Sequence, residues 1–321
     1  MMMKPSPRVE ILLAVYNNAP HLRALLQSLL EQTYDDFHLI VSDDASTDDS
    51  LAIVDEMAPA FRNPVEVIRR PKGSGSAKAN FAFLTQQAAV RGQADIICWC
   101  DADDVWKPEK TALLVQAVQA REAALGRDVP LYVQSDVHVV DANLGMIDPS
   151  FASFKKINPA EAHLLPRALI SPHGLGCAAA FNAALLKRLT DIPVDEVTGH
   201  DWYATLVALC FGAVHHIPDK TVLYRQHGGN SSAQKRVGLF SYPASKLRMM
   251  YEVRRRVEIR RRQAQAVITV FGDQLPPEAL RLITRFVATR GQNAIARRWV
   301  LWRERLLYPD RLRNTALMLF A

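Results

Sequence analysis

The sequence predicts an α/β protein built on a doubly wound, mostly parallel sheet. Short, nearly continuous apolar runs alternate with amphipathic stretches through the first 125 residues. This is the order of strands and helices in a parallel sheet with right-handed crossovers. Hydrophobic residues make up 49% and charged residues 22% of the 321-residue chain, a balance typical of an ordinary globular protein with a sizeable core.

Four strand–helix units follow one another. The predicted strands are apolar runs of the kind buried on both faces of a sheet, at residues 9–16, 37–44, 65–70 and 94–101. The predicted helices carry apolar residues at helical spacing, at residues 20–33, 50–61, 76–90 and 107–125. Ser50 suits the N-cap of the second helix, and Pro108 suits the first turn of the fourth.

Each predicted strand ends in a polar segment, and the four read "YNNAP", "SDDASTDD", "RPKGSGSAKAN" and "CDADDVW". Ligands of such sheets bind beyond the carboxyl ends of the strands. We therefore expect the four segments to lie together at that edge of the sheet, which we call the mouth. The chain contains neither G-x-G-x-x-G after its first strand nor G-x-x-x-x-G-K-[ST]. Their absence disfavours a dinucleotide Rossmann site and a P-loop.

The last of these segments places Asp101, Asp103 and Asp104 within four positions. Carboxylates held this close raise one another's pKa unless a cation offsets their repulsion. Oxygen ligands suit hard ions such as Mg²⁺ or Mn²⁺. Mg²⁺ uses few protein carboxylates and completes its shell with water and substrate phosphates, so the cluster predicts a metal–diphosphate site.

The cysteines and the apolar runs bear on the compartment. The four cysteines show no paired spacing, which favours a reducing compartment, and Cys98 and Cys100 are expected to be buried thiols. The apolar run near the N-terminus is too short for a signal peptide, and no run approaches the about 18 residues of a spanning helix. We therefore expect a cytoplasmic protein.

Charge divides the chain near residue 235. Residues 236–321 carry 18 Lys/Arg against 6 Asp/Glu, a net charge of +12, whereas residues 1–235 carry 21 against 27, a net charge of −6. We interpret this change as a boundary between a catalytic domain, residues 1–235, and a basic, mainly helical C-terminal region, residues 236–321.

The segment Lys246–Gln265 reads as an amphipathic helix with eight basic residues and two glutamates. Basic amphipathic helices bind acidic membrane surfaces, and we favour that role for the C-terminal region. The alternative is that the helix packs against the catalytic domain or against another subunit, with its arginines solvated.

The stretch "LLAVYNNAPHLRALLQSLLEQTYDDFHLIVSDDASTDDS", followed by "DADDVWKPEK", resembles the family 2 glycosyltransferases. The order and spacing of the V-Y-N, D-D-x-S-x-D and D-x-D-D segments carry the resemblance, which covers roughly residues 8–235. Later pieces, "GCAAAFN", "GHDWYATLVA" and "YRQHGGN", agree, and the last two are most similar to rhamnosyltransferase-like enzymes of bacterial surface polysaccharides. The resemblance implies a GT-A fold with an Asp-x-Asp metal motif.

The resemblance also implies roles for single residues in donor binding. Tyr16 and Asn17 would line the nucleotide pocket, and Asp44, rather than Asp43, would hydrogen-bond the base. Lys78 and Asn80 would lie beside the diphosphate and the sugar. Asp103 would be the first metal ligand, with Asp101 contacting the ribose, or the metal through water. For Asp48 we favour a capped turn instead of a site role.

The remaining motifs concern the reaction. An inverting transferase needs a base on the sugar face opposite the leaving diphosphate, while a metal carries the leaving-group charge. By similarity Asp201 is that base; it could instead be the N-cap of the helix that follows. Arg225 and His227 would reach the diphosphate or complete the metal shell after a loop closes, or the strand simply runs into an ordinary turn.

The sequence therefore predicts a Mg²⁺- or Mn²⁺-dependent inverting glycosyltransferase of bacterial cell-surface polysaccharide synthesis. It would move a sugar from a nucleoside diphosphate sugar, UDP- or dTDP-linked, to a glycan or polyprenyl-linked acceptor. We expect it at the inner face of the cell membrane, with no nucleic-acid partner, and a homodimer is left open. The alternatives are a nucleotidylyltransferase, which would want a glycine- and arginine-rich loop in place of "YNNAP", and a non-enzymatic polyanion- or membrane-binding protein.

Overall fold

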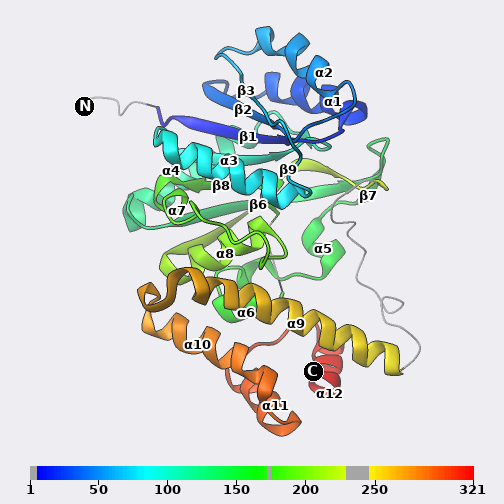
Figure 1. Ribbon diagram of the computed structural model, residues 1–321, viewed down its shortest axis with the longest axis vertical. Coiled ribbons are helices and arrows are strands. Elements are labelled where there is room, and N and C mark those ends of the chain that lie inside the picture. The colour runs from blue at the N-terminus through cyan, green and yellow to red at the C-terminus, as the bar shows by residue number, and fades with distance from the viewer. Residues whose placement is uncertain (1–5, 172–174, 229–245) are drawn as a thin grey trace.

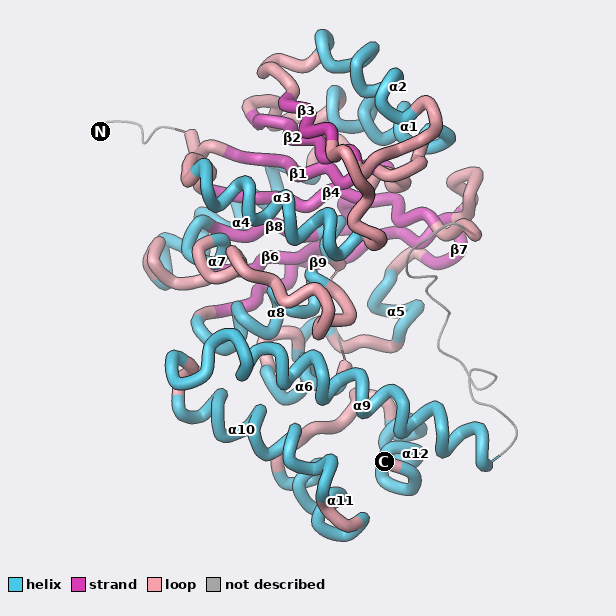
Figure 2. Tube along the Cα trace, in the orientation of Figure 1, coloured by secondary structure: helices cyan, strands magenta, loops and turns pink. Residues whose placement is uncertain are grey.

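The computed structural model describes residues 6–171, 175–228 and 246–321 (Figure 1). A nine-stranded mixed sheet forms its centre (Figure 2). Its strands lie in the order β3 (Glu66–Arg69), β2 (Phe37–Asp43), β1 (Val9–Val15), β4 (Ile96–Asp101), β8 (Ala179–Asn182), β6 (Leu131–Val140), β9 (Ala213–Arg225) and β5 (Val105–Trp106), and β7 (Met146–Asp148) pairs with β6. The predicted boundary near residue 235 lies outside the described residues.

The four predicted strand–helix units are present at the start of the chain. Their strands are β1 (Val9–Val15), β2 (Phe37–Asp43), β3 (Glu66–Arg69) and β4 (Ile96–Asp101), and they pair with one another in parallel. Their helices are α1 (Ala19–Leu30), α2 (Ser50–Met57), α3 (Ala77–Arg91) and α4 (Lys110–Leu125). The carboxyl ends of β1, β2 and β4 therefore meet at one edge, as the pattern predicts.

Two positions predicted at helix starts are wrong: the N-cap of α2 is Asp49 instead of Ser50, and Pro108 lies before the first turn of α4. Ser50 lies inside α2, where Asp48 Oδ1 accepts the Ser50 N–H and the Ser50 hydroxyl oxygen accepts the N–H of Asn18. Asp48 is thus part of a hydrogen-bonded turn, as favoured from the sequence. Pro108 precedes α4, because its carbonyl accepts the Thr33 N–H and holds this segment outside the helix.

The second half of the sheet was not predicted as strands. It contains β5 (Val105–Trp106), β6 (Leu131–Val140), β7 (Met146–Asp148), β8 (Ala179–Asn182) and β9 (Ala213–Arg225). β8 lies antiparallel between β4 and β6, whereas β9 runs parallel to β6. The long ladders are parallel and the antiparallel ones are short, so the sheet is mostly parallel, as predicted.

The sheet separates two apolar layers. Alternate side chains of β1 enter different layers: Leu12 packs on one side, and Ile11 and Leu13 on the other. Leu22 of α1 and Leu114 of α4 belong to the second layer. The first layer lies under α3 and under the later helices α6 (Leu165–Ile170), α7 (Ala183–Leu186) and α8 (His200–Phe211). The phenylalanines of α5 (Phe151–Lys155) join the second layer.

The C-terminal region is helical, as predicted, and packs on the rest of the protein. It comprises α9 (Lys246–Phe271), α10 (Pro277–Ala288), α11 (Ala294–Arg303) and α12 (Arg311–Phe320). The first apolar layer continues into it through Val257, Val267 and Phe286. The Arg260 side chain donates to the carbonyl of Ile170 in α6. Much of the apolar stripe of α9 is therefore covered by α6, α8, α10 and α12. Among the described helices, none combines the length and the apolar character needed to cross a bilayer.

Gly212, between α8 and β9, provides a test of this packing. A Cβ atom there would lie 2.0 Å from the Pro130 carbonyl oxygen, the acceptor of the Ala213 N–H that starts β9. We expect Gly212→Ala to lower the free energy of unfolding by about 3 kcal/mol, measured by urea denaturation. Gly291→Ala, whose Cβ meets nothing within 4 Å, is the control and should change it by less than about 1 kcal/mol. Equal stability of both variants would contradict this close approach.

Candidate active site

The turns after β1 and β2 are tied together at the mouth of the sheet. Asn17, with a φ of 50°, donates its N–H to the Ser46 hydroxyl at 3.0 Å and accepts the Thr47 N–H on Oδ1 at 2.8 Å. Tyr16 beside it is largely exposed. Tyr16 and Asn17, which were predicted to line the nucleotide pocket, therefore lie in a turn that hydrogen bonds attach to the turn after β2.

Asp44 is buried and anchors the loop after β3. Its carboxylate accepts the N–H and the hydroxyl of Ser74, at 2.9 and 2.7 Å, and pairs with Arg70 Nη1 at 2.9 Å. Asn80 is also buried, and its amide bonds the hydroxyl and the carbonyl of Ser42. Both side chains hold local structure here, and their part in donor binding stays a prediction.

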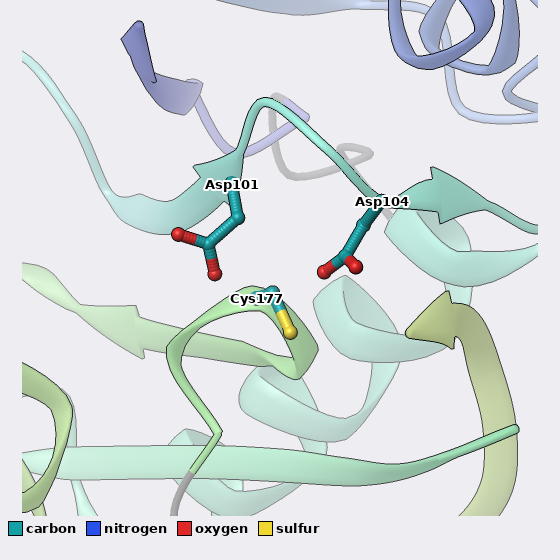
Figure 3. A group of neighbouring side chains, drawn as sticks. All are labelled: Asp101, Asp104 and Cys177. Atoms are coloured by element: carbon teal, nitrogen blue, oxygen red, sulfur yellow. The ribbon is translucent and has the colours of Figure 1, made fainter. Parts of the chain in front are cut away.

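The acidic cluster lies at the end of β4. Atoms of Asp101, Asp104 and Cys177 lie within 4.8 Å of one another, and the Asp104 carboxylate points toward the thiol (Figure 3). Asp104 is fully buried, and Oδ1 accepts the Arg225 N–H at 2.9 Å. No well-aligned donor among the described residues reaches Asp104 Oδ2.

Burial and mutual repulsion act on these carboxyl groups. Burial, with the charge of Asp103 as the next cause, raises the pKa of Asp104 to about 7. The pKa of Asp101 is also well above its ordinary value, first because of burial and then because of Asp103, Asp104 and Asp201. The site therefore favours protons or another cation beside these oxygens.

Asp103 turns to a different partner. Its Oδ2 lies 2.9 Å from His227 Nε2, and the ring of His227 lies 4.7 Å from the ring of His21. Arg225 is buried; its Nε donates to the Asp103 carbonyl at 2.7 Å and its Nη1 to the Ala142 carbonyl at 2.5 Å. The structure thus brings the predicted residues Asp103, Arg225 and His227 together.

Lys110, which the sequence analysis did not single out, lies buried beneath the cluster. Its Nζ donates to the Cys177 carbonyl at 2.5 Å and lies 2.9 Å from the centre of the Trp106 ring. Burial lowers its pKa to about 8, although Asp104 and nearby thiols act in the opposite direction. The sequence contained a signal for this role. A lysine in the first turn of a helix is unfavourable because its charge opposes the helix dipole, so a lysine at this position indicates a specific contact.

Asp201 lies near the acidic cluster, in the first turn of α8. The cap of α8 is Gly199, so the alternative that Asp201 is the N-cap is wrong. Asp201 Oδ2 accepts the Gly176 N–H at 3.2 Å, and its charge contributes to the raised pKa of Asp101. The neighbouring His200 stacks on Phe81, with ring centres 4.3 Å apart.

Two distant side chains brace the segment just before Asp201. Lys78 Nζ donates to the Val197 carbonyl at 2.8 Å. Gln263 of α9 is buried; its Oε1 accepts the Thr198 N–H at 2.6 Å and its Nε2 donates to the Gly199 carbonyl at 3.3 Å. The C-terminal region thus takes part in shaping this side of the site. One signal in the sequence could have indicated that Gln263 contacts the site: it is an uncharged residue directly after a run of arginines.

The side-chain atoms of the acidic cluster could coordinate a divalent cation. Carboxylate oxygens dominate it, and Asp104 offers a buried oxygen without an aligned donor. Asp101, Asp104 and Cys177 could hold the ion, whereas Asp103, the ligand expected first from the sequence, faces His227. Oxygen-rich ligands favour Mg²⁺ or Mn²⁺, while the Cys177 thiol adds one soft ligand to the group.

A model of the glycosyl transferase family 2 matches residues 10–190, more than half of the chain. The chain belongs to glycosyltransferase family 2. It is therefore a glycosyltransferase, and this membership decides against a nucleotidylyltransferase and against a non-enzymatic binding protein.

Curated relatives agree with this assignment. The chain is 25% identical over 233 residues to an uncharacterized glycosyltransferase of Nostoc sp., a match spanning 70% of this chain and 66% of that protein. It is 23% identical over 225 residues to the dTDP-rhamnosyl transferase RfbG of Shigella flexneri, spanning 68% of this chain and 72% of that protein.

Solved structures share the fold. Staphylococcus aureus TarS (residues 1–349), in complex with UDP-GlcNAc, superposes with a TM-score of 0.57 at 16% identity, over 92% of this chain and 80% of that one. The mannosyltransferase PcManGT of Pyrobaculum calidifontis, in complex with GDP-Man and Mn²⁺, gives 0.54 at 21% identity, over 94% and 74%. The predicted GT-A fold is confirmed.

The bracing of Asp201 by Gln263 can be measured. We expect Gln263→Met, which keeps the length and loses both hydrogen bonds, to lower kcat for sugar transfer roughly tenfold through misplacement of the α8 start. The KM for the donor should stay unchanged. The matched control is Gln265→Met, an exposed position on the same helix. Loss of folding without a kcat change in the remaining native protein would contradict this role.

Proposed function

We propose that the protein is a metal-dependent, inverting glycosyltransferase that takes its sugar from a nucleoside diphosphate sugar. The observation that carries this proposal is the acidic cluster at the end of β4, with Asp201 close to it. The neighbours crystallised with UDP-GlcNAc and with GDP-Man and Mn²⁺ support a nucleotide-sugar donor and a metal.

The donor would lie across the mouth of the sheet. Tyr16, Asn17 and Asp44 surround the place for the nucleoside, and they belong to the turns that follow β1 and β2. A divalent ion held by Asp103 and Asp101 would supply positive charge to the leaving diphosphate. Lys78 and Asn80, both on α3, stay candidates for contacts on the sugar side.

Asp201 would accept the proton. As the acceptor hydroxyl oxygen forms its bond to the anomeric carbon, the bond from that carbon to the diphosphate oxygen breaks and the hydroxyl proton passes to Asp201. The carboxylate is partly buried, and the Gly176 N–H fixes one of its oxygens. Attack from the face opposite the leaving group inverts the anomeric centre.

The acceptor and the location are proposed on chemical grounds. The likeness to a dTDP-rhamnosyl transferase of Shigella flexneri supports a deoxyhexose or hexose donor and a bacterial surface polysaccharide as product. The acceptor would be a glycan or a polyprenyl-linked saccharide. An enzyme that uses a polyprenyl-linked acceptor works at a membrane surface, which the basic C-terminal region suits.

Asp103→Asn tests the metal assignment. Removing one carboxylate charge should weaken Mn²⁺-dependent binding of UDP or dTDP at least about tenfold, measured by isothermal titration calorimetry. Asp219→Asn, an exposed position in β9, should bind like the wild type. An unchanged titration of Asp103→Asn would remove this residue from the metal site.

Asp201→Asn tests the base. The variant should keep its affinity for the donor, because the change lies on the acceptor side, and should lose transfer activity by about 100-fold or more. The measurements are donor titration and initial rates of sugar transfer. Asp195→Asn, on the exposed part of the same connection, should keep both. Transfer by Asp201→Asn at the normal rate would discard the assignment.

A further inference from the structure

Helix α11 (Ala294–Arg303) carries an apolar face that the described part of the protein leaves largely exposed. Ile295, Trp299 and Trp302 are 79%, 46% and 66% exposed. Their spacing of four and three residues places them on one side of the helix. Val300 and Leu301 on the other side are buried, so the helix is fixed by its inner face and displays its outer one.

The two tryptophans on this face differ from the other three in the chain. Trp99, Trp106 and Trp202 are buried, with at most 6% of their surface exposed. A helix that exposes two indoles and an isoleucine on one side loses favourable burial unless something apolar covers them. Arg285 and Arg303 lie 5.8 and 4.9 Å from the centre of the Trp299 ring but leave this side chain 46% exposed, so the face points to a partner.

Positive charge surrounds the face. Helix α11 contains three arginines and no acidic residue. Arg290 before it pairs with Glu258, and Glu304 after it pairs with Arg281 and Arg285. The Arg303 guanidinium lies 4.9 Å from the centre of the Trp299 ring. Arg254 and Arg298 lie close enough to Arg297 to lower its pKa, after the larger effect of burial. The rim of the α11 face therefore suits anionic groups.

The position of α11 leaves the active site free. The helix lies at the end of the molecule opposite α2 and β3 (Figure 1), and it packs on α10 rather than on the sheet. A surface that binds here can hold the protein without contacting the mouth at the ends of β1, β2 and β4.

We propose that the α11 face, formed by Ile295, Trp299 and Trp302, docks on a lipid bilayer that contains anionic phospholipids. Indole rings settle at the level of the headgroups, where one edge is apolar and the N–H meets water. The arginines around them contact the lipid phosphates. Trp and Ile on one side of a basic helix form the pattern of a helix that lies in the membrane interface.

The proposed α11 contact rests on the membrane association that is part of the proposed function and assigns it to a different helix. The sequence predicted that Lys246–Gln265 binds the membrane, yet much of the apolar stripe of that helix packs inside the protein. The lipid contact is instead assigned to α11, a short helix whose exposed side chains become evident only when its packed face is known.

Vesicle binding by the full chain tests the inference. Wild-type protein should sediment with vesicles of phosphatidylcholine and phosphatidylglycerol and far less with phosphatidylcholine alone. Trp299→Ser/Trp302→Ser should weaken that binding about tenfold or more. Val90→Ser, which changes a side chain 78% exposed on α3, is the matched control and should bind like the wild type. All of the changed side chains are exposed, and an unchanged melting temperature verifies folding.

Tryptophan fluorescence gives a second readout from the same samples. Because the other tryptophans are buried, anionic vesicles should shift the emission of wild-type protein to the blue through Trp299 and Trp302, and leave the double variant unchanged. Equal binding of wild type and double variant would overturn the inference, as would equal binding to neutral vesicles or none at all.

Self-association is the competing outcome. If sedimentation velocity without lipid shows a dimer that the double variant abolishes, the face joins two copies of the chain and the inference fails. Neither experiment needs sugar transfer. The donor titration of the double variant shows separately whether the proposed function holds, so failure of one can be told from failure of the other.

Discussion

The crowding of carboxylates at the end of β4 is the constraint on which the rest of the site depends. Asp101 and Asp104 approach each other beside Cys177, where burial disfavours their charged forms. A buried charge is costly unless it is paired. The ammonium of Lys110 supplies one positive charge from below, held by the Cys177 carbonyl and the Trp106 ring. Lys110 and the buried Arg225 bring two positive charges to three aspartates, and the remaining negative charge supports the proposed cation site.

Holding this cluster engages distant parts of the chain. Arg225, at the end of β9, fixes Asp104 through its N–H and the Asp103 carbonyl through its guanidinium. The opposite side of the mouth, where Asp201 lies, is held by Lys78 from α3 and by Gln263 from α9. The C-terminal region is therefore joined to the catalytic part by a shared apolar layer as well as by these bonds. Helix α11 of this region exposes the apolar face that we propose to bind a lipid bilayer.

Much of the first half of the fold could be predicted from sequence, because buried parallel strands read as continuous apolar runs and amphipathic helices lie between them. Strand β8 could not be predicted, because its sequence "AAFN" is short and it is a strand only through its pairing with β4 and β6. The acidic motif predicted the cluster, but local sequence could not show that Asp103 turns to His227 whereas Asp104 turns to Cys177. Lys110 and Gln263 escaped prediction because their contacts join segments more than 60 residues apart.

The account's central claim is that the carboxylates hold a cation and that the cation holds the diphosphate of a sugar donor. Thermal denaturation against a panel of nucleoside diphosphate sugars, each with and without Mn²⁺ or Mg²⁺, tests it most directly. A ligand that binds the native state raises the melting temperature by mass action. The account predicts a rise with one nucleotide class that requires the metal. A rise of the same size in the presence of a chelator, or no rise with any donor and metal, would contradict it.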